Sequence, residues 1–154
     1  MRGSPVAIES MTLADLPGVL AIERMSFTSP WTEANFRYEI EENPMAWNVV
    51  ARAGGGVAAF ACAHVVADEL MIDDLAVDAA ARRRGIGSGL LRHLLEGARI
   101  RGCRRATLEV RPSNAPARAL YAAFKFEVVG RRRGYYSDTG EDAILLACAL
   151  SPAP

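Results

Sequence analysis

Residues 70–91 read LMIDDLAVDAAARRRGIGSGLL, an apolar strand that leads through an arginine-rich, glycine-spaced loop into an amphipathic helix. Glycines at positions 85, 87 and 89 lie where that helix begins, and they let a ligand approach the backbone closely. Unpaired backbone N–H groups and the positive end of the helix dipole favour anions at such a point. Arg82, Arg83 and Arg84 add positive charge. The stretch therefore predicts a phosphate-binding junction.

The rest of the chain has the composition of one soluble domain. Its 154 residues are 51% hydrophobic and 23% charged, with 18 basic and 18 acidic side chains. This length favours a single domain over residues 1–154. The longest uncharged stretch, residues 53–67, is shorter than the about 20 residues that span a bilayer. We expect a cytoplasmic protein that binds neither membranes nor, given its balanced charge, nucleic acid directly.

Cysteine and histidine give no indication of a metal site. Cys62, Cys103 and Cys148 are widely separated and lack the paired spacing of zinc ligands. His64 and His93 stand near no cysteine or carboxylate pattern that suggests a metal. We therefore expect reduced thiols and no bound metal.

Hydrophobic periodicity divides the chain into the helices and strands of a mixed α/β fold. Helices are predicted from Thr12 to about Phe27, over residues 33–42, from the glycine loop to Gly102, and after a cap at Ser113 or Asn114. Strands are predicted over residues 47–53, 57–66, 70–77, 105–111, 126–130 and 141–150. Residues 54–56, all glycine, should close a hairpin, and the later strand–helix alternation requires at least one parallel pairing. The last helix should turn Ala119, Leu120, Ala123 and Phe124 inward.

Two familiar phosphate loops fit the junction poorly. A nucleoside-triphosphate P-loop carries a lysine after its last glycine, and the only lysine of this chain is Lys125. A dinucleotide-binding loop needs a third glycine where the chain has Leu90. Glu109, at about the right distance downstream for a ribose ligand, leaves the dinucleotide alternative open.

A third kind of loop matches better. The pattern Arg82-x-x-Gly85-x-Gly87 after Leu75-Ala76-Val77 resembles the acetyl-coenzyme A loop of the GNAT acetyltransferases. Six further stretches are similar to the bacterial ribosomal-protein-alanine N-acetyltransferases, namely SPWT (29–32), LEVRPSN (108–114), ALY (119–121), FKF (124–126), RRGYY (132–136) and EDA (141–143). The resemblance covers nearly the whole chain. Two departures are Arg82, where many members have glutamine, and Gly134, where close relatives can have asparagine.

The resemblance implies a GNAT fold, a mixed and mostly antiparallel sheet of six to seven strands with a splayed parallel pair and about four flanking helices. It also implies that acetyl-coenzyme A is bound with its pantetheine arm between the splayed strands and its pyrophosphate on the loop. The residues expected to contact acetyl-coenzyme A are Leu75, Ala76, Val77, Arg82, Arg83, Arg84, Gly85, Ile86, Gly87, Ser88, Asn114 and Tyr121.

By the same resemblance, Glu109 is the general base and Tyr121 the general acid of acetyl transfer. Strand alternation agrees for Glu109, since it places this side chain on the face opposite Leu108 and Val110. Trp31, Tyr135 and Tyr136 are candidates for lining a groove that binds the acceptor peptide.

The expected acceptor is the N-terminal α-amine of a protein, in particular of a ribosomal protein. An α-amine, with a pKa of about 7.7 to 8.0, is appreciably neutral at cellular pH, whereas a lysine amine with a pKa of about 10.4 is not. The carboxylates of Asp68, Glu69, Asp73 and Asp74 are candidates for attracting a basic peptide. A lysine side chain or small amine is the alternative acceptor, and a non-catalytic coenzyme A-binding module is the alternative function.

Overall fold

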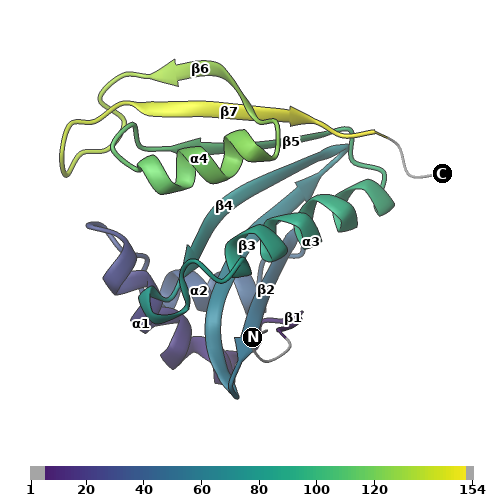
Figure 1. The fold of residues 1–154 in the computed structure, drawn as a ribbon, viewed down its shortest axis with the longest axis vertical. Helices are drawn as coiled ribbons and strands as arrows, with labels where there is room; N and C mark the ends of the chain where they lie inside the picture. The colour runs from purple at the N-terminus through teal and green to yellow at the C-terminus, as the bar shows by residue number, and fades with distance from the viewer. Residues whose placement is uncertain (1–5, 152–154) are drawn as a thin grey trace.

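The computed structural model describes residues 6–151. Its seven strands form one sheet in the order β1-β2-β3-β4-β5-β7-β6 (Figure 1). The strands are β1 (Ala7–Ser10), β2 (Ala46–Ala53), β3 (Gly56–Val66), β4 (Glu69–Val77), β5 (Arg105–Val110), β6 (Glu127–Arg132) and β7 (Ala143–Ala149). The helices are α1 (Leu16–Ser26), α2 (Glu33–Glu41), α3 (Ile86–Ile100) and α4 (Ala115–Ala123), with single 3₁₀ turns η1 (Leu13–Asp15) and η2 (Ala79–Ala81).

The mixed α/β fold and its mostly antiparallel sheet are confirmed. Every neighbouring pair of strands is antiparallel except β4 and β5. The predicted elements all form, and their ends shift by one or two residues except at the start of the first helix, where Leu13–Asp15 form the 3₁₀ turn η1 and α1 begins at Leu16. Strand β1, which pairs with residues 49–52 of β2, was not predicted from the sequence. Four residues that are nearly all exposed carry no alternating hydrophobic signal.

The predicted glycine hairpin joins β2 and β3. Gly54 and Gly55 have φ of 63° and 84°, and the strands close on the pair Ala53 and Gly56. Two consecutive residues with positive φ are what the tightest right-twisted hairpin turns require.

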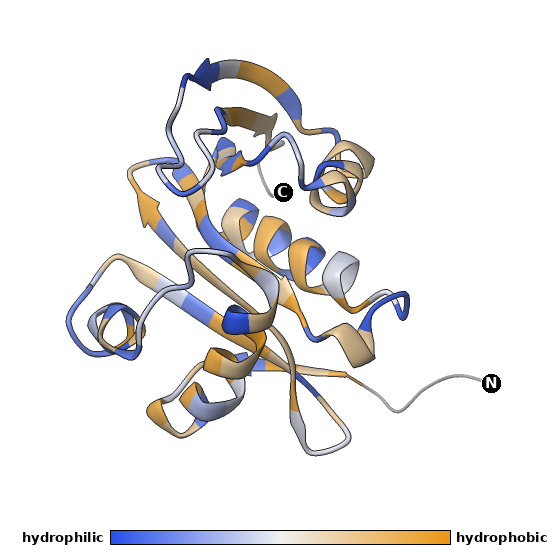
Figure 2. Ribbon diagram, turned by 90° about the vertical axis from the view of Figure 1, so that its left-hand side faces the viewer, coloured by the Kyte–Doolittle hydropathy of each residue, from blue (hydrophilic) through white to orange (hydrophobic). Residues whose placement is uncertain are grey.

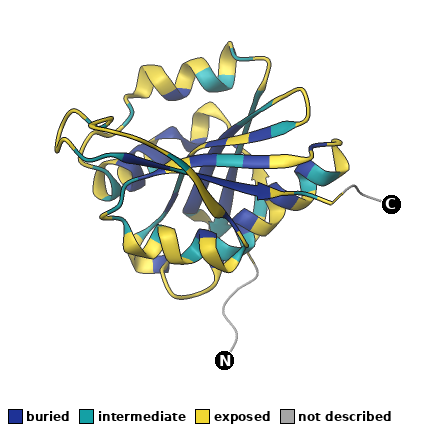
Figure 3. Cartoon of the chain, turned by 90° about the horizontal axis from the view of Figure 1, so that it is seen from above, coloured by how far each residue is buried: buried dark blue, intermediate teal, exposed yellow. Residues whose placement is uncertain are grey.

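Helices cover both faces of the sheet. The apolar stripe of α3 is buried against alternate residues of β3 and β4, including Ala61, Leu70 and Ile72. On the other face, α1 and α2 bury Val19 and Phe36 against residues that include Phe60 of β3. Figure 2 shows hydrophobic and hydrophilic residues interspersed along each helix, and Figure 3 shows buried residues concentrated in the strands. No helix within residues 6–151 is both long and apolar enough to cross a membrane.

Helix α4 turns a different set of residues inward than the sequence predicts. Leu120 and Phe124 are partly buried as expected, but Ala119 and Ala123 are exposed and Tyr121 is buried instead. Helix α4 is short and packs through one narrow stripe, which residues 117, 120, 121 and 124 form.

The splayed parallel pair is formed by β4 and β5. Residues 69–72 of β4 pair with residues 105–108 of β5, and no pairing follows beyond Ile72 and Leu108. A bulge at Asp73 interrupts the register between β3 and β4 at the same level. Beyond it, β4 follows β3 while β5 follows β7, so the two strands diverge (Figure 1). Within residues 6–151, the β4 edge at residues 75–77 therefore has no strand partner on the β5 side.

Candidate active site

The arginine loop reaches α3 with the first turn of the helix uncapped by any side chain. Gly85 is the N-cap in the left-handed conformation, with φ of 75°, and its carbonyl accepts from Gly89 N at 2.9 Å. Arg83 has a positive φ of 64°, which a non-glycine residue rarely adopts. The tight loop thus presents the free N–H groups of the helix start, as an anion site requires.

The three arginines of the loop are exposed. Arg82 is held against the end of β4, because its Nε donates to Val77 O at 3.3 Å. Within the part of the chain that the structure describes, no carboxylate forms an ion pair with residues 82–84. Their positive charge is therefore available to a phosphate group.

Gly87 brings the start of α3 close to both β4 and α4. A Cβ at this position would lie 3.3 Å from Val77 Cγ2 and 3.7 Å from Leu120 Cδ2. Because Gly87 has no side chain, the start of α3 can lie against Val77 at the end of the free β4 edge. A β-strand edge continuous with an anion site suits a ligand that has amide groups in one part and phosphates in another, and acetyl-coenzyme A is such a ligand.

Asn114 is the N-cap of α4. Of the two caps that the sequence allowed, Ser113 and Asn114, it is therefore the second that forms. Its side-chain oxygen accepts from Ala117 N at 3.2 Å. Its amide nitrogen makes no hydrogen bond within residues 6–151. The predicted contact of Asn114 with acetyl-coenzyme A would use that nitrogen.

Glu109 lies where the parallel strands begin to part. It follows Leu108, the last residue of β5 that pairs with β4, and its side chain is 31% exposed. Arg132 Nε of β6 is 3.6 Å from its carboxylate. The charge of Glu109 and a hydrogen bond to it raise the pKa of Tyr135. The predicted outward direction of Glu109 is confirmed, and the carboxylate is near one of the predicted groove tyrosines.

Tyr121 is buried, with 6% of its surface exposed. Its ring packs on Phe126 at 5.5 Å between centroids. Burial raises the pKa of Tyr121 far above its ordinary value, and the charge of Asp74 adds to this. The phenol therefore keeps its proton at every physiological pH and can serve as a proton donor.

The aromatic residues predicted for the acceptor groove lie on two loops. Trp31 precedes α2 and is half-buried against Phe36, with 5.2 Å between ring centroids. A hollow beside it is lined by Trp31, Asn35, Tyr38 and Glu39. Tyr135 and Tyr136 follow β6 and pack edge to face at 5.1 Å.

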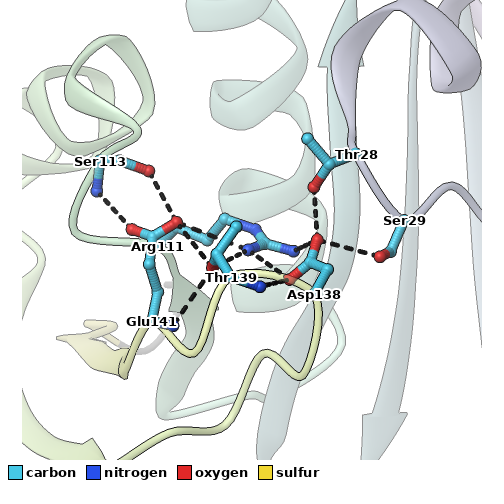
Figure 4. Close-up of polar contacts among 7 residues, drawn as sticks. All are labelled: Thr28, Ser29, Arg111, Ser113, Asp138, Thr139 and Glu141. Atoms are coloured by element: carbon cyan, nitrogen blue, oxygen red, sulfur yellow. Dashed lines mark hydrogen bonds and ion pairs between the residues drawn. The ribbon is translucent and has the colours of Figure 1, made fainter.

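A polar cluster that the sequence analysis did not predict ties these two loops together (Figure 4). Asp138, on the β6–β7 loop, accepts from Thr28 Oγ1 at 2.5 Å and from Ser29 Oγ at 3.0 Å, both on the loop between α1 and α2. Arg111, just after β5, donates to both Asp138 oxygens at 2.8 and 3.0 Å and lies 3.9 Å from the centroid of the Tyr136 ring. These bonds hold the pKa of Asp138 well below its ordinary value.

The same cluster fixes the start of α4. Glu141 accepts from Ser113 N at 3.1 Å and from Ser113 Oγ at 3.0 Å, and it lies 3.5 Å from Arg111. Thr139 bridges Arg111 and Glu141 through its hydroxyl. Arg111, Ser113 and Glu141 belong to stretches that carried the family resemblance, but nothing in the sequence paired them with Asp138 or Thr28.

The acidic patch that the sequence suggested does not form. Asp74 is buried, and Asp68 and Glu69 lie at the opposite end of β4 from the splay. Glu69 accepts there from Thr107 at 3.2 Å. Asp73 pairs with His64 at 2.5 Å. The prediction fails because residues adjacent on a bulged strand point in different directions.

No group of three or more histidine, cysteine, aspartate or glutamate side chains suited to a metal is found within residues 6–151. The three cysteines are free and buried.

Comparison with known proteins agrees with this geometry. The family model described as the acetyltransferase (GNAT) family matches residues 16–126, more than half of the chain. A putative ribosomal protein bS18-alanine N-acetyltransferase of Bacillus subtilis is 39% identical over 140 residues, which cover 91% of this chain and 93% of that protein. The chain belongs to the GNAT acetyltransferase family. It is an acyltransferase, and its GNAT sheet has the parallel pair β4–β5 as its only parallel pairing within residues 6–151.

Solved GNAT structures give the same result. The crystal structure of the ribosomal-protein-S18-alanine N-acetyltransferase of Escherichia coli has a TM-score of 0.88 with this chain, at 38% identity and 97% coverage of both chains. The Arabidopsis thaliana NAA60 structure in complex with acetyl-CoA has a TM-score of 0.81 over 94% of this chain and 98% of that one. At 21% identity, it shows the shared fold alone.

Proposed function

We propose that this GNAT enzyme transfers the acetyl group of acetyl-coenzyme A to the N-terminal α-amine of a protein, with ribosomal protein bS18 as the first candidate. Relatives that match nearly the whole chain are named for alanine N-acetylation of bS18. A ribosomal acceptor would place the enzyme in the cytoplasm. The central observation is the free edge of β4 at residues 75–77. It begins just past the last β4–β5 pair, where Glu109 lies on β5, and its end at Val77 packs against Gly87 in the first turn of α3.

Acetyl-coenzyme A would be held by two parts of this arrangement. The free backbone groups of residues 75–77 would pair with the amides of the pantetheine arm, as a further strand would. The N–H groups of residues 85–88 and the guanidinium groups of residues 82–84 would hold the pyrophosphate. When bound, this cosubstrate supplies an acetyl thioester.

Glu109 would act on the acceptor side of the reaction. The neutral amine forms the new C–N bond with the acetyl carbon, and the C–S bond breaks as its electron pair leaves with sulfur. Glu109 accepts the proton that the amine loses, directly or through one water molecule. Its position one residue past the last β4–β5 pair, partly open to solvent, suits this role.

Tyr121 would return a proton to the sulfur. Because burial keeps the phenol protonated, it is in the form that a general acid needs. Tyr121 lies on α4, whose neighbouring Leu120 is close to Gly87 at the head of α3. Acid and base would therefore come from different elements, α4 and β5.

Trp31 and Tyr135-Tyr136 would border the acceptor peptide, on loops that Asp138 joins. A lysine amine is almost entirely protonated at cellular pH and would need a stronger base than one partly exposed carboxylate. An α-amine has a lower pKa and is partly neutral already, which favours it as the acceptor.

Intact-mass measurement after incubation with acetyl-coenzyme A tests the proposal. We expect one acetyl group on the N-terminal peptide of bS18 and none on the same peptide with a blocked N-terminus and a free lysine. Preferential acetylation of polyamines or lysine would overturn the proposed acceptor. Binding of acetyl-coenzyme A without transfer to any amine would favour the non-catalytic module.

A further inference from the structure

Two buried carboxyl groups lie beneath the proposed acceptor loop. Glu23 on α1 is 1% exposed and Asp74 on β4 is 8% exposed. Glu23 Oε2 accepts from Trp31 N at 2.8 Å, so Glu23 fixes the loop that carries Trp31. Glu23 Oε1 and Asp74 Oδ2 are both buried, and neither has a hydrogen-bond partner among the described residues.

The groups that face this pair supply no positive charge. Cys62 faces it from β3 and Tyr121 from α4, and Asp73 is its neighbour on β4. Glu39 of α2 acts on Cys62 and Asp73 rather than on the pair itself. Within residues 6–151, the basic side chain that acts on this set of groups is His64, which is paired with Asp73. Two ionised carboxylates buried without a cation would cost several kcal/mol, so a proton between them is the remaining way to satisfy both free oxygens.

We propose that Glu23 and Asp74 share one proton and act as a positioning pair that joins the Trp31 loop to the β4 segment at residues 74–77. The functional half of this inference rests on the proposed function, in which the Trp31 loop borders the acceptor and residues 75–77 hold acetyl-coenzyme A. The proton makes one carboxyl a donor to the other, while Glu23 Oε2 stays free to accept from Trp31.

The shared proton makes the pair sensitive to pH. Burial raises the pKa of Asp74 well above its ordinary value, and the hydrogen bond and charge of Glu23 raise it further. A raised folded-state pKa means that the native protein binds more protons than the unfolded chain. The stabilising contribution is therefore complete below the unfolded pKa of about 3.9 and is lost as pH rises through the folded pKa.

Thermal unfolding between pH 4 and pH 9 without any substrate tests the shared proton, because this range starts near the ordinary pKa of Asp and runs in the direction in which the pKa of Asp74 is shifted. Asp74→Asn places a permanent donor where the proton is proposed, and Asp74→Ala removes both donor and acceptor. The melting temperature of the wild type should fall toward pH 9 relative to that of Asp74→Asn, and Asp74→Ala should be the least stable at pH 6. The exposed turn variant Asp68→Asn is the control and should keep the wild-type pH dependence.

Two results would overturn the shared proton. One is a constant difference in melting temperature between wild type and Asp74→Asn across this pH range. The other is an Asp74→Asn variant as unstable as Asp74→Ala at pH 6. Neither result depends on the identity of the acceptor, so failure of the proposed function would leave this test intact.

Steady-state kinetics test the positioning role. The wild-type KM for the bS18 N-terminal peptide should rise severalfold toward pH 9 relative to that of Asp74→Asn, while kcat changes in parallel in the two proteins. Asp74→Ala should have a raised peptide KM at every pH, which Asp74→Asn restores. Identical KM profiles for wild type and Asp74→Asn would overturn the positioning role. An inactive wild type would instead overturn the proposed function.

Discussion

Glu109 and Tyr121 differ in burial, and that difference separates their proposed roles. A carboxylate that is 31% exposed can exchange protons with solvent after each turnover. A phenol that is 6% exposed, with a raised pKa, holds its proton until a strong base forms beside it. Glu109 therefore suits the role of proton acceptor, and Tyr121 suits the role of proton donor.

Replacing Glu109 by glutamine should remove the base while keeping the shape of the side chain. We expect kcat for the peptide to fall by about 10² to 10⁴, the usual worth of a positioned acid or base. The melting temperature should stay close to that of the wild type, because the side chain is partly exposed. Steady-state kinetics and thermal unfolding measure the two effects. Glu127→Gln, on the exposed face of β6, is the matched control, and equal kcat in the two variants would refute the assignment.

Replacing Tyr121 by phenylalanine should keep the ring against Phe126 and remove only the hydroxyl. If Tyr121 protonates the leaving sulfur, kcat should fall while KM for acetyl-coenzyme A changes little. Because the pKa of Tyr121 is raised, the wild-type pH–rate profile should show no loss of this acid below about pH 10. An unchanged kcat in Tyr121→Phe would assign the tyrosine to packing alone.

At the scale of elements, Trp47 of β2 determines how α3 packs against the sheet. A Cβ at Gly97 would lie 2.4 Å from Trp47 Cη2, and the guanidinium of Arg101 lies over the indole, 3.6 Å from the ring centroid. Gly97→Ala should therefore destabilise the fold by about 1–3 kcal/mol through overpacking, which outweighs the gain in helix propensity.

Chemical denaturation measures this effect. Gly89→Ala on the same helix is the control, since a Cβ there meets no atom within 4 Å. We expect it to stabilise the protein by up to about 1 kcal/mol. Stabilisation by both variants would mean that Trp47 moves away without cost.

The Asp138 cluster couples the two loops that border the proposed acceptor groove. Asp138→Asn keeps one acceptor oxygen but loses the charge that Arg111 requires, so the β6–β7 loop should separate more readily from Thr28 and Ser29. The peptide KM should rise while KM for acetyl-coenzyme A stays constant. Asp142→Asn is the control, because Asp142 bonds only to Arg131 and Gly134 within residues 6–151. A matching rise in both variants would show a general loosening of the hairpin instead.

At the scale of the whole molecule, local patterns predicted the elements and the family resemblance predicted their arrangement. Alternation through residues 105–110 and the stripe on α3 are local signals, and both were confirmed. Thr28 and Asp138 are 110 residues apart, and their contact depends on how the sheet curves and which loops it brings together. The contact between Glu23 and Asp74 likewise depends on the bulge at Asp73, and no sequence pattern predicts that bulge.

The two halves of the sheet also explain why the site lies where it does. Strands β1–β4 and strands β5–β7 are joined by four residue pairs between β4 and β5. Past these pairs, Glu109 follows on β5, Asp74 of β4 acts on Tyr121 of α4, and Val77 of β4 lies against Gly87 at the start of α3. The central claim is that this divergence serves acetyl transfer to a protein N-terminus.

Intact-mass spectrometry on a competition mixture tests that claim most directly. The purified enzyme would receive limiting acetyl-coenzyme A together with the free N-terminal peptide of bS18, its N-terminally blocked form with a free lysine, and spermidine. We expect one acetyl group on the free N-terminal peptide ahead of both competitors, and loss of that product in Glu109→Gln. Acetylation of spermidine or the lysine peptide ahead of the free N-terminus would contradict it.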